Sequence, residues 1–209
     1  MSRPRKGKST ACGLAKVAVV FCATLVFCAT NVGCSPSEPA APKSDESEPA
    51  AQVERPPAPV ISIPLVDRSG FDAILAEHNG RVVLVDCWAT WCLPCIAQLP
   101  HSAELAKDLG GKGLTVVALS FDEPEDVDQV RKALEGAGIG SSGVVTLQSK
   151  FGSSSESLDA FEITSGALPH YKLYDRTGKL RRAFHLDPAA RQQFTAIEID
   201  AAVVELLAE

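Results

Sequence analysis

Residues 81–95 read RVVLVDCWATWCLPC, a run of apolar and β-branched residues that ends in two cysteines separated by two residues. The run Arg81–Trp88 predicts a strand that is buried on both faces of a sheet. A helix is expected to begin at the Cys92–Cys95 turn and to end near residue 109, where two glycines follow. The cysteine pair therefore lies between a buried strand and the N-terminus of a helix.

This position favours reactivity at the first cysteine. Unpaired backbone N–H groups and the helix dipole stabilise a thiolate at Cys92. The thiolate is the nucleophile in disulfide exchange. Pro94 is tolerated because a residue in the first turn has no partner within the helix for its N–H. C-x-x-C in this setting is typical of a redox pair, so Cys92 and Cys95 are the candidate redox-active residues.

The distribution of the seven cysteines supports this interpretation. Four lie in the first 34 residues, and only Cys87, Cys92 and Cys95 lie beyond them. The remainder of the chain is long enough to bury its own core, so it does not depend on a disulfide framework. Cys87 is expected to pack as a buried free thiol.

The rest of the chain from residue 60 alternates predicted strands and helices. Strands are expected at 60–66, 81–88, 114–121 and 144–147, with an antiparallel hairpin at 171–174 and 179–184. Helices are expected at 69–79 with Ser69 as its cap, 92–109, 125–135, 155–161, and from Pro188 to the C-terminus. This order predicts an α/β sandwich with a central mixed sheet flanked by helices.

The stretch from Val85 to Cys95 resembles the active site of the thioredoxin superfamily. It is most similar to the membrane-anchored thiol–disulfide oxidoreductases of the TlpA and ResA type. A second match, Gly166-Ala167-Leu168-Pro169, follows about 75 residues later in the same order. The resemblance covers residues 60–209 and implies a thioredoxin-like fold.

The resemblance also implies a role for each matching residue. Cys92 would attack the substrate disulfide, and Cys95 would resolve the mixed disulfide. Pro169 would have a cis peptide bond, would face the cysteines and, with the backbone of Leu168, would pair with the substrate chain. The remaining expected substrate-binding residues are Trp91, Leu93 and Pro94.

Asp86 is the most informative single position. A carboxylate within a run of Val and Leu is costly unless it is paired or protonated. It matches the buried aspartate of thioredoxins, which is proposed to take the proton of the second cysteine. Many membrane-anchored relatives have Asn there and a glutamate three residues after the second cysteine, where this chain has Gln98. The alternative is a hydrogen-bonded structural carboxylate.

The first 59 residues are predicted to lie outside the fold. Residues 1–34 combine five basic residues, an apolar stretch and Gly33-Cys34, which predicts a signal peptide with Cys34 as a lipidation site or, alternatively, an uncleaved anchor. Residues 35–59 hold seven of the 14 prolines and predict a disordered linker. The domain at 60–209 would therefore be exported and membrane-anchored, facing the periplasm or the cell exterior.

The net charge and the family resemblance indicate which partners to expect. Removal of residues 1–33 leaves 15 basic residues against 26 acidic ones, a net charge of −11, so nucleic acid is not an expected partner. The resemblance implies a protein disulfide as substrate, possible service in cytochrome c maturation, and a membrane electron donor of the thiol–disulfide type. Leu-Pro between the cysteines lacks the histidine of strong oxidants, which favours a reductase. No cofactor is expected.

Alternative functions of this fold make different demands on these residues. A peroxiredoxin would need a cysteine in a Pro-x-x-x-Thr-x-x-Cys setting, which the sequence lacks. A copper chaperone of this fold would use C-x-x-x-C, one residue longer than the spacing here. A non-catalytic scaffold that uses the fold only for binding is a further alternative. A zinc site at Cys87, Cys92 and Cys95 would lack a fourth ligand at a familiar spacing, so no metal site is predicted.

His170 and the acidic run after residue 121 are expected to have structural roles. His170 follows Pro169 and could change the reactivity of the cysteines. The favoured interpretation is a surface histidine near a groove. The acidic run Asp122–Asp128 is expected to cap a helix and to face solvent.

Overall fold

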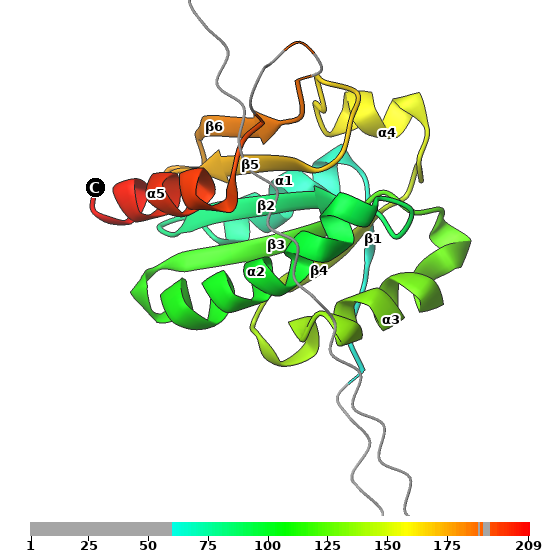
Figure 1. The fold of residues 1–209 in the computed structure, drawn as a ribbon, viewed down its shortest axis with the longest axis horizontal. Helices are drawn as coiled ribbons and strands as arrows, with labels where there is room; N and C mark the ends of the chain where they lie inside the picture. The colour runs from blue at the N-terminus through cyan, green and yellow to red at the C-terminus, as the bar shows by residue number, and fades with distance from the viewer. Residues whose placement is uncertain (1–59, 188, 190–192) are drawn as a thin grey trace, which may run out of the picture. The chain divides into compact units, whose positions relative to one another are not determined.

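The computed structural model describes residues 60–187, 189 and 193–209 (Figure 1). The predictions for residues 1–34 and 35–59, including lipidation at Cys34, lie outside the described residues. In the part of the chain that is described, no helix is both long and apolar enough to cross a membrane.

A mixed sheet of six strands forms the centre of residues 60–209, in the spatial order β1-β4-β3-β2-β5-β6. The first four strands in this order run parallel, and β5 and β6 are antiparallel to their neighbours. The bounds are β1 Leu65–Val66, β2 Val82–Trp88, β3 Leu114–Ser120, β4 Val145–Ser149, β5 His170–Tyr174 and β6 Leu180–His185. The predicted α/β sandwich with a mixed sheet is confirmed.

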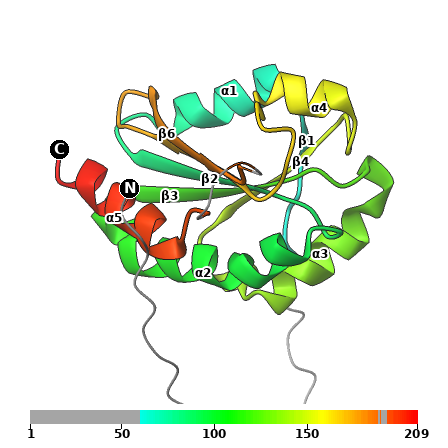
Figure 2. The ribbon, with the colours of Figure 1, turned by 45° about the horizontal axis from the view of Figure 1, so that its top comes forward.

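Helices cover both faces of this sheet. The bounds are α1 Arg68–Glu77, α2 Leu93–Leu109, α3 Val127–Gly136, α4 Ser155–Ala160 and α5 Ala196–Leu207. Figure 2 shows α1 and α4 on one face, with α2, α3 and α5 on the other. Short 3-10 turns precede α3 and follow α2 and α3.

The central strands explain why residues 81–88 read as one apolar run. Every residue of β2 and β3 is buried, because helices pack on both sides of these strands. Val83 and Val85 belong to the apolar core on the α1 side, whereas Val82 and Leu84 belong to the core on the α5 side. Alternation along β2 therefore distributes its residues between two cores.

The first strand and the first helix differ from the sequence prediction. Only Leu65 and Val66 pair with β4, so the strand predicted at 60–66 is short. The cap of α1 is Asp67 rather than Ser69, because the Asp67 carboxylate accepts the backbone N–H of Gly70 at 2.9 Å. Ser69 instead donates its hydroxyl proton to Asp67.

The last helix also begins later than predicted. Residues 193–195 are not helical, and α5 starts at Ala196 instead of Pro188. Thr195 and Glu198 form a capping box: the backbone N–H of each residue donates to the side-chain oxygen of the other. These two bonds satisfy N–H groups that would otherwise lack partners at the helix start.

We expect Thr195→Ala to lower the free energy of unfolding by about 1 kcal/mol, because the helix loses its side-chain cap. Urea titration followed by circular dichroism measures this change. Thr164→Ala, at an exposed position in the loop before β5, serves as the control. Equal stability of the two variants would contradict the capping role of Thr195.

Candidate active site

The two cysteines lie at the junction of β2 and α2. They form a disulfide in this structure, with their Cα atoms 5.3 Å apart. Cys92 is the N-cap of α2, and the backbone N–H of Cys95 points at Cys92 Sγ over 3.3 Å. A negative charge on Cys92 would therefore meet an N–H donor and the positive end of the helix.

The surroundings of the disulfide are apolar and asymmetric. Cys92 keeps 5% of its accessible surface, whereas Cys95 keeps none. Trp91 and Leu93 flank Cys92 and are 59% and 79% exposed, and Pro94 is also exposed. Large exposed apolar side chains around a reactive group are typical of a binding surface. An incoming chain would meet Cys92 before Cys95.

The second predicted motif lies beside the first. The peptide bond between Leu168 and Pro169 is cis, and Pro169 immediately precedes β5. Since β5 runs antiparallel to β2 with His170 opposite Cys87, Pro169 lies at the end of β2 from which the Cys92 loop departs.

A pocket of about 300 Å³ connects these two segments. Trp91 lines it from the loop before α2, and Leu168 lines it from the segment before β5. Its other lining residues are Phe121, Ser153, Leu158, Gly166 and Ala167. The fold thus brings two of the predicted substrate-binding residues to one mostly apolar pocket.

Asp86 is fully buried on the α2 face of β2. Its Oδ2 accepts the Ser102 hydroxyl at 2.7 Å, and its Oδ1 has no hydrogen-bond partner. Burial raises the pKa of Asp86 from its ordinary value of 3.8 to about 7, against the lowering effect of the hydrogen bond from Ser102. Ser102 lies seven positions after Cys95, two helical turns along the same face of α2. The Asp86 carboxyl therefore lies under the face that carries Cys95.

The sequence did not single out Tyr171 or Ser102, which complete the surroundings of Asp86. Tyr171 faces Asp86 across the β2–β5 pair and is buried. Its hydroxyl donates to Gln98 Oε1 at 3.2 Å. We refer to Asp86, Gln98, Ser102 and Tyr171 as the Asp86 cluster. Only a pairing between strands more than 80 residues apart reveals that Tyr171 belongs to it.

Asp122 is a further residue whose role the sequence did not reveal, and its expected exposure was wrong. It is buried at the end of β3 instead of facing solvent. Both of its carboxylate oxygens accept the backbone N–H of Thr90 at 3.0 Å, and one also accepts the Ser120 hydroxyl at 2.7 Å. Asp122 thereby fixes the loop that leads from β2 to Cys92.

His170 is buried, so its interpretation as a surface histidine was wrong. Burial and the nearby positive charge of Lys172 lower the pKa of His170 from 6.5 to about 4. The ring is stacked on His185 at 5.7 Å between centroids. A neutral imidazole brings no positive charge to stabilise a thiolate.

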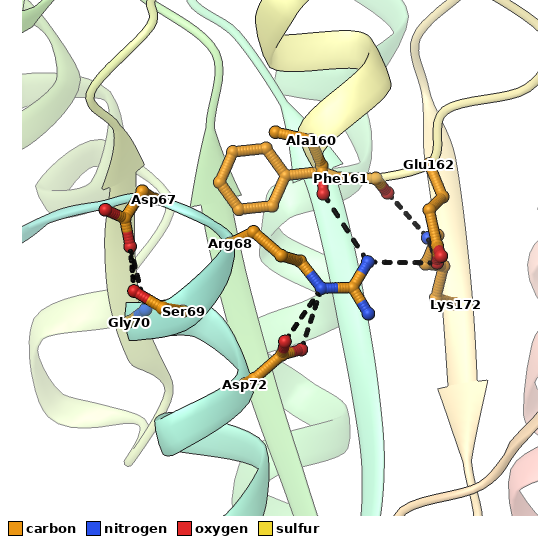
Figure 3. Close-up of polar contacts among 9 residues, drawn as sticks. All are labelled: Asp67, Arg68, Ser69, Gly70, Asp72, Ala160, Phe161, Glu162 and Lys172. Carbon is orange, nitrogen blue, oxygen red and sulfur yellow. Dashed lines mark hydrogen bonds and ion pairs between the residues drawn. The ribbon is translucent and has the colours of Figure 1, made fainter.

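Lys172 lies on the same face of β5 and is 3% exposed. Its ammonium group donates to the carbonyl oxygen of Phe161 at 2.6 Å and to Glu162 at 3.3 Å. Arg68 reaches the same Glu162 carboxylate at 3.2 Å and also binds Asp72 (Figure 3). These contacts fix the end of α4, from which the chain continues to Pro169.

Cys87 is a buried free cysteine, and burial raises the pKa of its thiol. Within residues 60–187, 189 and 193–209, no group of three or more His, Cys, Asp or Glu side chains is placed to share a metal ion.

Known thiol–disulfide oxidoreductases are similar to this chain in sequence. The thiol–disulfide oxidoreductase ResA of Geobacillus kaustophilus is 28% identical over 118 residues, which cover 56% of this chain and 62% of that protein. The thioredoxin-like protein YneN of Bacillus subtilis is 41% identical over 64 residues, 30% of this chain and 37% of that protein. The chain thus matches less than two thirds of the length of these relatives.

A solved structure is also similar. The secreted disulfide oxidoreductase of Mycobacterium tuberculosis that is homologous to E. coli DsbE superposes with a TM-score of 0.49 at 18% identity, over 68% of this chain and 94% of that one. The model of the AhpC/TSA family matches residues 56–190, which is more than half of the sequence. The chain belongs to the AhpC/TSA family.

Proposed function

We propose that the chain is a thiol–disulfide oxidoreductase that reduces disulfide bonds in proteins through Cys92 and Cys95. The observation that carries this proposal is the Cys92–Cys95 disulfide at the N-terminus of α2, with Cys92 slightly exposed and Cys95 fully enclosed. The curated relatives named as thiol–disulfide oxidoreductases support the same activity. Because only part of their length is matched, these relatives do not identify the substrate of this chain.

The proposed reaction begins with both cysteines reduced. The Cys92 thiolate attacks one sulfur of the substrate disulfide, forms a mixed disulfide and releases the other substrate sulfur as a thiolate, which takes up a proton. The Cys95 thiolate then attacks Cys92 Sγ and releases the second substrate sulfur. Two electrons pass to the substrate, and the protein ends with the disulfide seen in this structure.

Asp86 would serve the second step as a base. Cys95 must lose its proton before it can attack, and it lies along the α2 face beneath which Asp86 is buried. A buried carboxyl whose pKa is raised to about 7 can accept a proton and release it again near neutral pH.

The surroundings of Cys92 favour reduction over oxidation. Leu93 and Pro94 supply no charge, and His170 is neutral because burial lowers its pKa to about 4. Only the N-terminus of α2 stabilises the thiolate among these groups. The less the reduced form is stabilised, the weaker an oxidant the disulfide is.

The substrate would bind across the pocket between Trp91 and Leu168, next to the cis Leu168–Pro169 peptide bond. We also propose export and anchoring through residues 1–34, with a membrane thiol–disulfide protein as the electron donor. Oxidised apocytochrome c is a candidate substrate on the basis of the family resemblance alone. A copper chaperone or a binding scaffold is the alternative, and it predicts no catalysed reduction.

Reduction of insulin by dithiothreitol tests the activity directly. We expect Cys92→Ser to fall to the uncatalysed rate because the nucleophile is lost. Cys95→Ser should accumulate a mixed disulfide with the substrate, which mass spectrometry of the non-reduced protein detects. Cys87→Ala is the matched control, and it should keep the activity. Full activity of Cys92→Ser would contradict the proposal.

Asp86 should make stability fall as the pH rises. An acid whose pKa is raised by folding keeps its proton in the folded protein after the unfolded chain has lost it. Its contribution is therefore complete below pH 3.8 and is lost progressively as the pH rises to about 7. The loss is on the order of 4 kcal/mol for a shift of this size.

Urea unfolding of the oxidised protein between pH 4 and pH 8 measures this dependence. We expect Asp86→Asn to remove most of the loss, so that its stability relative to the wild type increases with pH. Asp108→Asn is the control, since Asp108 is exposed on the same helix that covers Asp86. Parallel stability curves for Asp86→Asn and the wild type would show that Asp86 is ionised at neutral pH.

A further inference from the structure

The Asp86 cluster contains one hydroxyl group with two competing acceptors. The phenol of Tyr171 has a single proton to donate. In this structure that proton goes to Gln98 Oε1, over 3.2 Å. Asp86 Oδ1 is fully buried and has no partner, and Tyr171 is the cross-strand neighbour of Asp86 in the β2–β5 pair.

The preferred acceptor depends on the proton of Asp86. An ionised carboxylate is a stronger acceptor than an amide oxygen, and hydrogen bonds to it are about twice as strong as neutral ones. A protonated carboxyl loses that advantage, and Gln98 Oε1 then competes successfully for the hydroxyl. A buried carboxylate with an unpaired oxygen is costly, so ionisation of Asp86 calls for a second donor besides Ser102.

We propose that Tyr171 is a positioning residue whose hydroxyl moves its hydrogen bond from Gln98 to Asp86 when the Asp86 carboxyl loses its proton. Gln98 then acts as the resting acceptor for this hydroxyl, and it opposes the ionisation of Asp86. The role of Tyr171 in disulfide exchange rests on the proposed function, because it acts by making the Asp86 base available to Cys95.

Other groups around Asp86 set the background for this exchange. On α2, Ser102 donates to the carboxyl and His101 lies near it, bound to Asp200 of α5 at 2.9 Å. Cys95 precedes them on the same helix. Cys87 and Lys172 lie on the opposite face of the sheet. None of the variants described below changes either residue.

Tyr171→Phe removes the hydroxyl and leaves the ring in place. We expect the pKa of Asp86 to rise by about one unit, because a donor that favours the ionised form is lost. Carbon-13 NMR of the aspartate carboxyl groups in the full oxidised chain measures this, with the Asp86 signal assigned by its disappearance in Asp86→Asn. No change, or a fall, would overturn the proposal.

Gln98→Met provides the opposite test. It removes the competing acceptor at a half-buried position with a side chain of similar length. The hydroxyl is then free for Asp86, so the pKa of Asp86 should fall. The double variant Tyr171→Phe/Gln98→Met should match Tyr171→Phe alone, because Gln98 acts only through the hydroxyl. A rise in Gln98→Met, or additive shifts in the double variant, would show two independent packing effects and overturn the proposal.

Tyr174→Phe is the matched control, since Tyr174 is buried on the same strand but belongs to the core on the other face of the sheet. It should leave the Asp86 titration unchanged, and a comparable shift would overturn the specific role of Tyr171. A second readout is the pH dependence of mixed-disulfide resolution, which should move upward in Tyr171→Phe and downward in Gln98→Met. The NMR titration decides the proposal even if the unchanged protein fails to reduce insulin.

Discussion

Strand β2 has no face in contact with water, and the reactive groups take their properties from this constraint. Its seven residues lie between β3 and β5 with helices on both sides. A titratable side chain in such a strand must be neutral or fully paired. Burial raises the pKa of Asp86 to about 7, so the charge of this carboxyl changes near neutral pH. Burial also raises the pKa of Cys87, which therefore remains a thiol.

The β2–β5 pair also places the buried carboxyl of Asp86 and the buried ammonium group of Lys172 on opposite faces of the sheet. Asp86 and Tyr171 face each other on the α2 side, while Cys87 and His170 face each other on the α1 side. Lys172 shares the second side, where Glu162 and a carbonyl oxygen pair with its charge. The sheet backbone thus lies between the buried lysine and the buried carboxylate. This arrangement prevents a salt bridge that would hold Asp86 permanently ionised and make it a poor proton acceptor.

Local patterns were sufficient to predict the centre of the fold and the cysteine pair. The apolar run before Cys92 predicted β2, and two glycines marked the end of α2 near Leu109. The predicted start of α5 at Pro188 was wrong, because the helix begins after Thr195, whose side chain forms a capping box with Glu198. The Thr-x-x-Glu pattern of this box is a local N-terminal signal that the sequence carries.

The remaining features depend on contacts between distant segments. Asp122 lies in an acidic run that is typical of a solvated helix start, and only the approach of the loop at Thr90 explains its burial. His170 follows a proline at the end of a loop, and no local pattern indicates that its ring stacks on His185. Such burial comes from strand pairing, which a pattern within one segment does not encode.

These distant contacts control the cysteine pair indirectly. Asp122 fixes the approach to Cys92, and Lys172 fixes the end of α4 before the Pro169 segment. Neither residue needs to touch a sulfur atom to determine the geometry on the two sides of the pocket. Trp91 and Leu93 expose large apolar side chains beside Cys92. Under the proposed function, selectivity for a substrate would come from the shape of the pocket and from backbone pairing, while the buried Asp86 carboxyl would serve proton transfer.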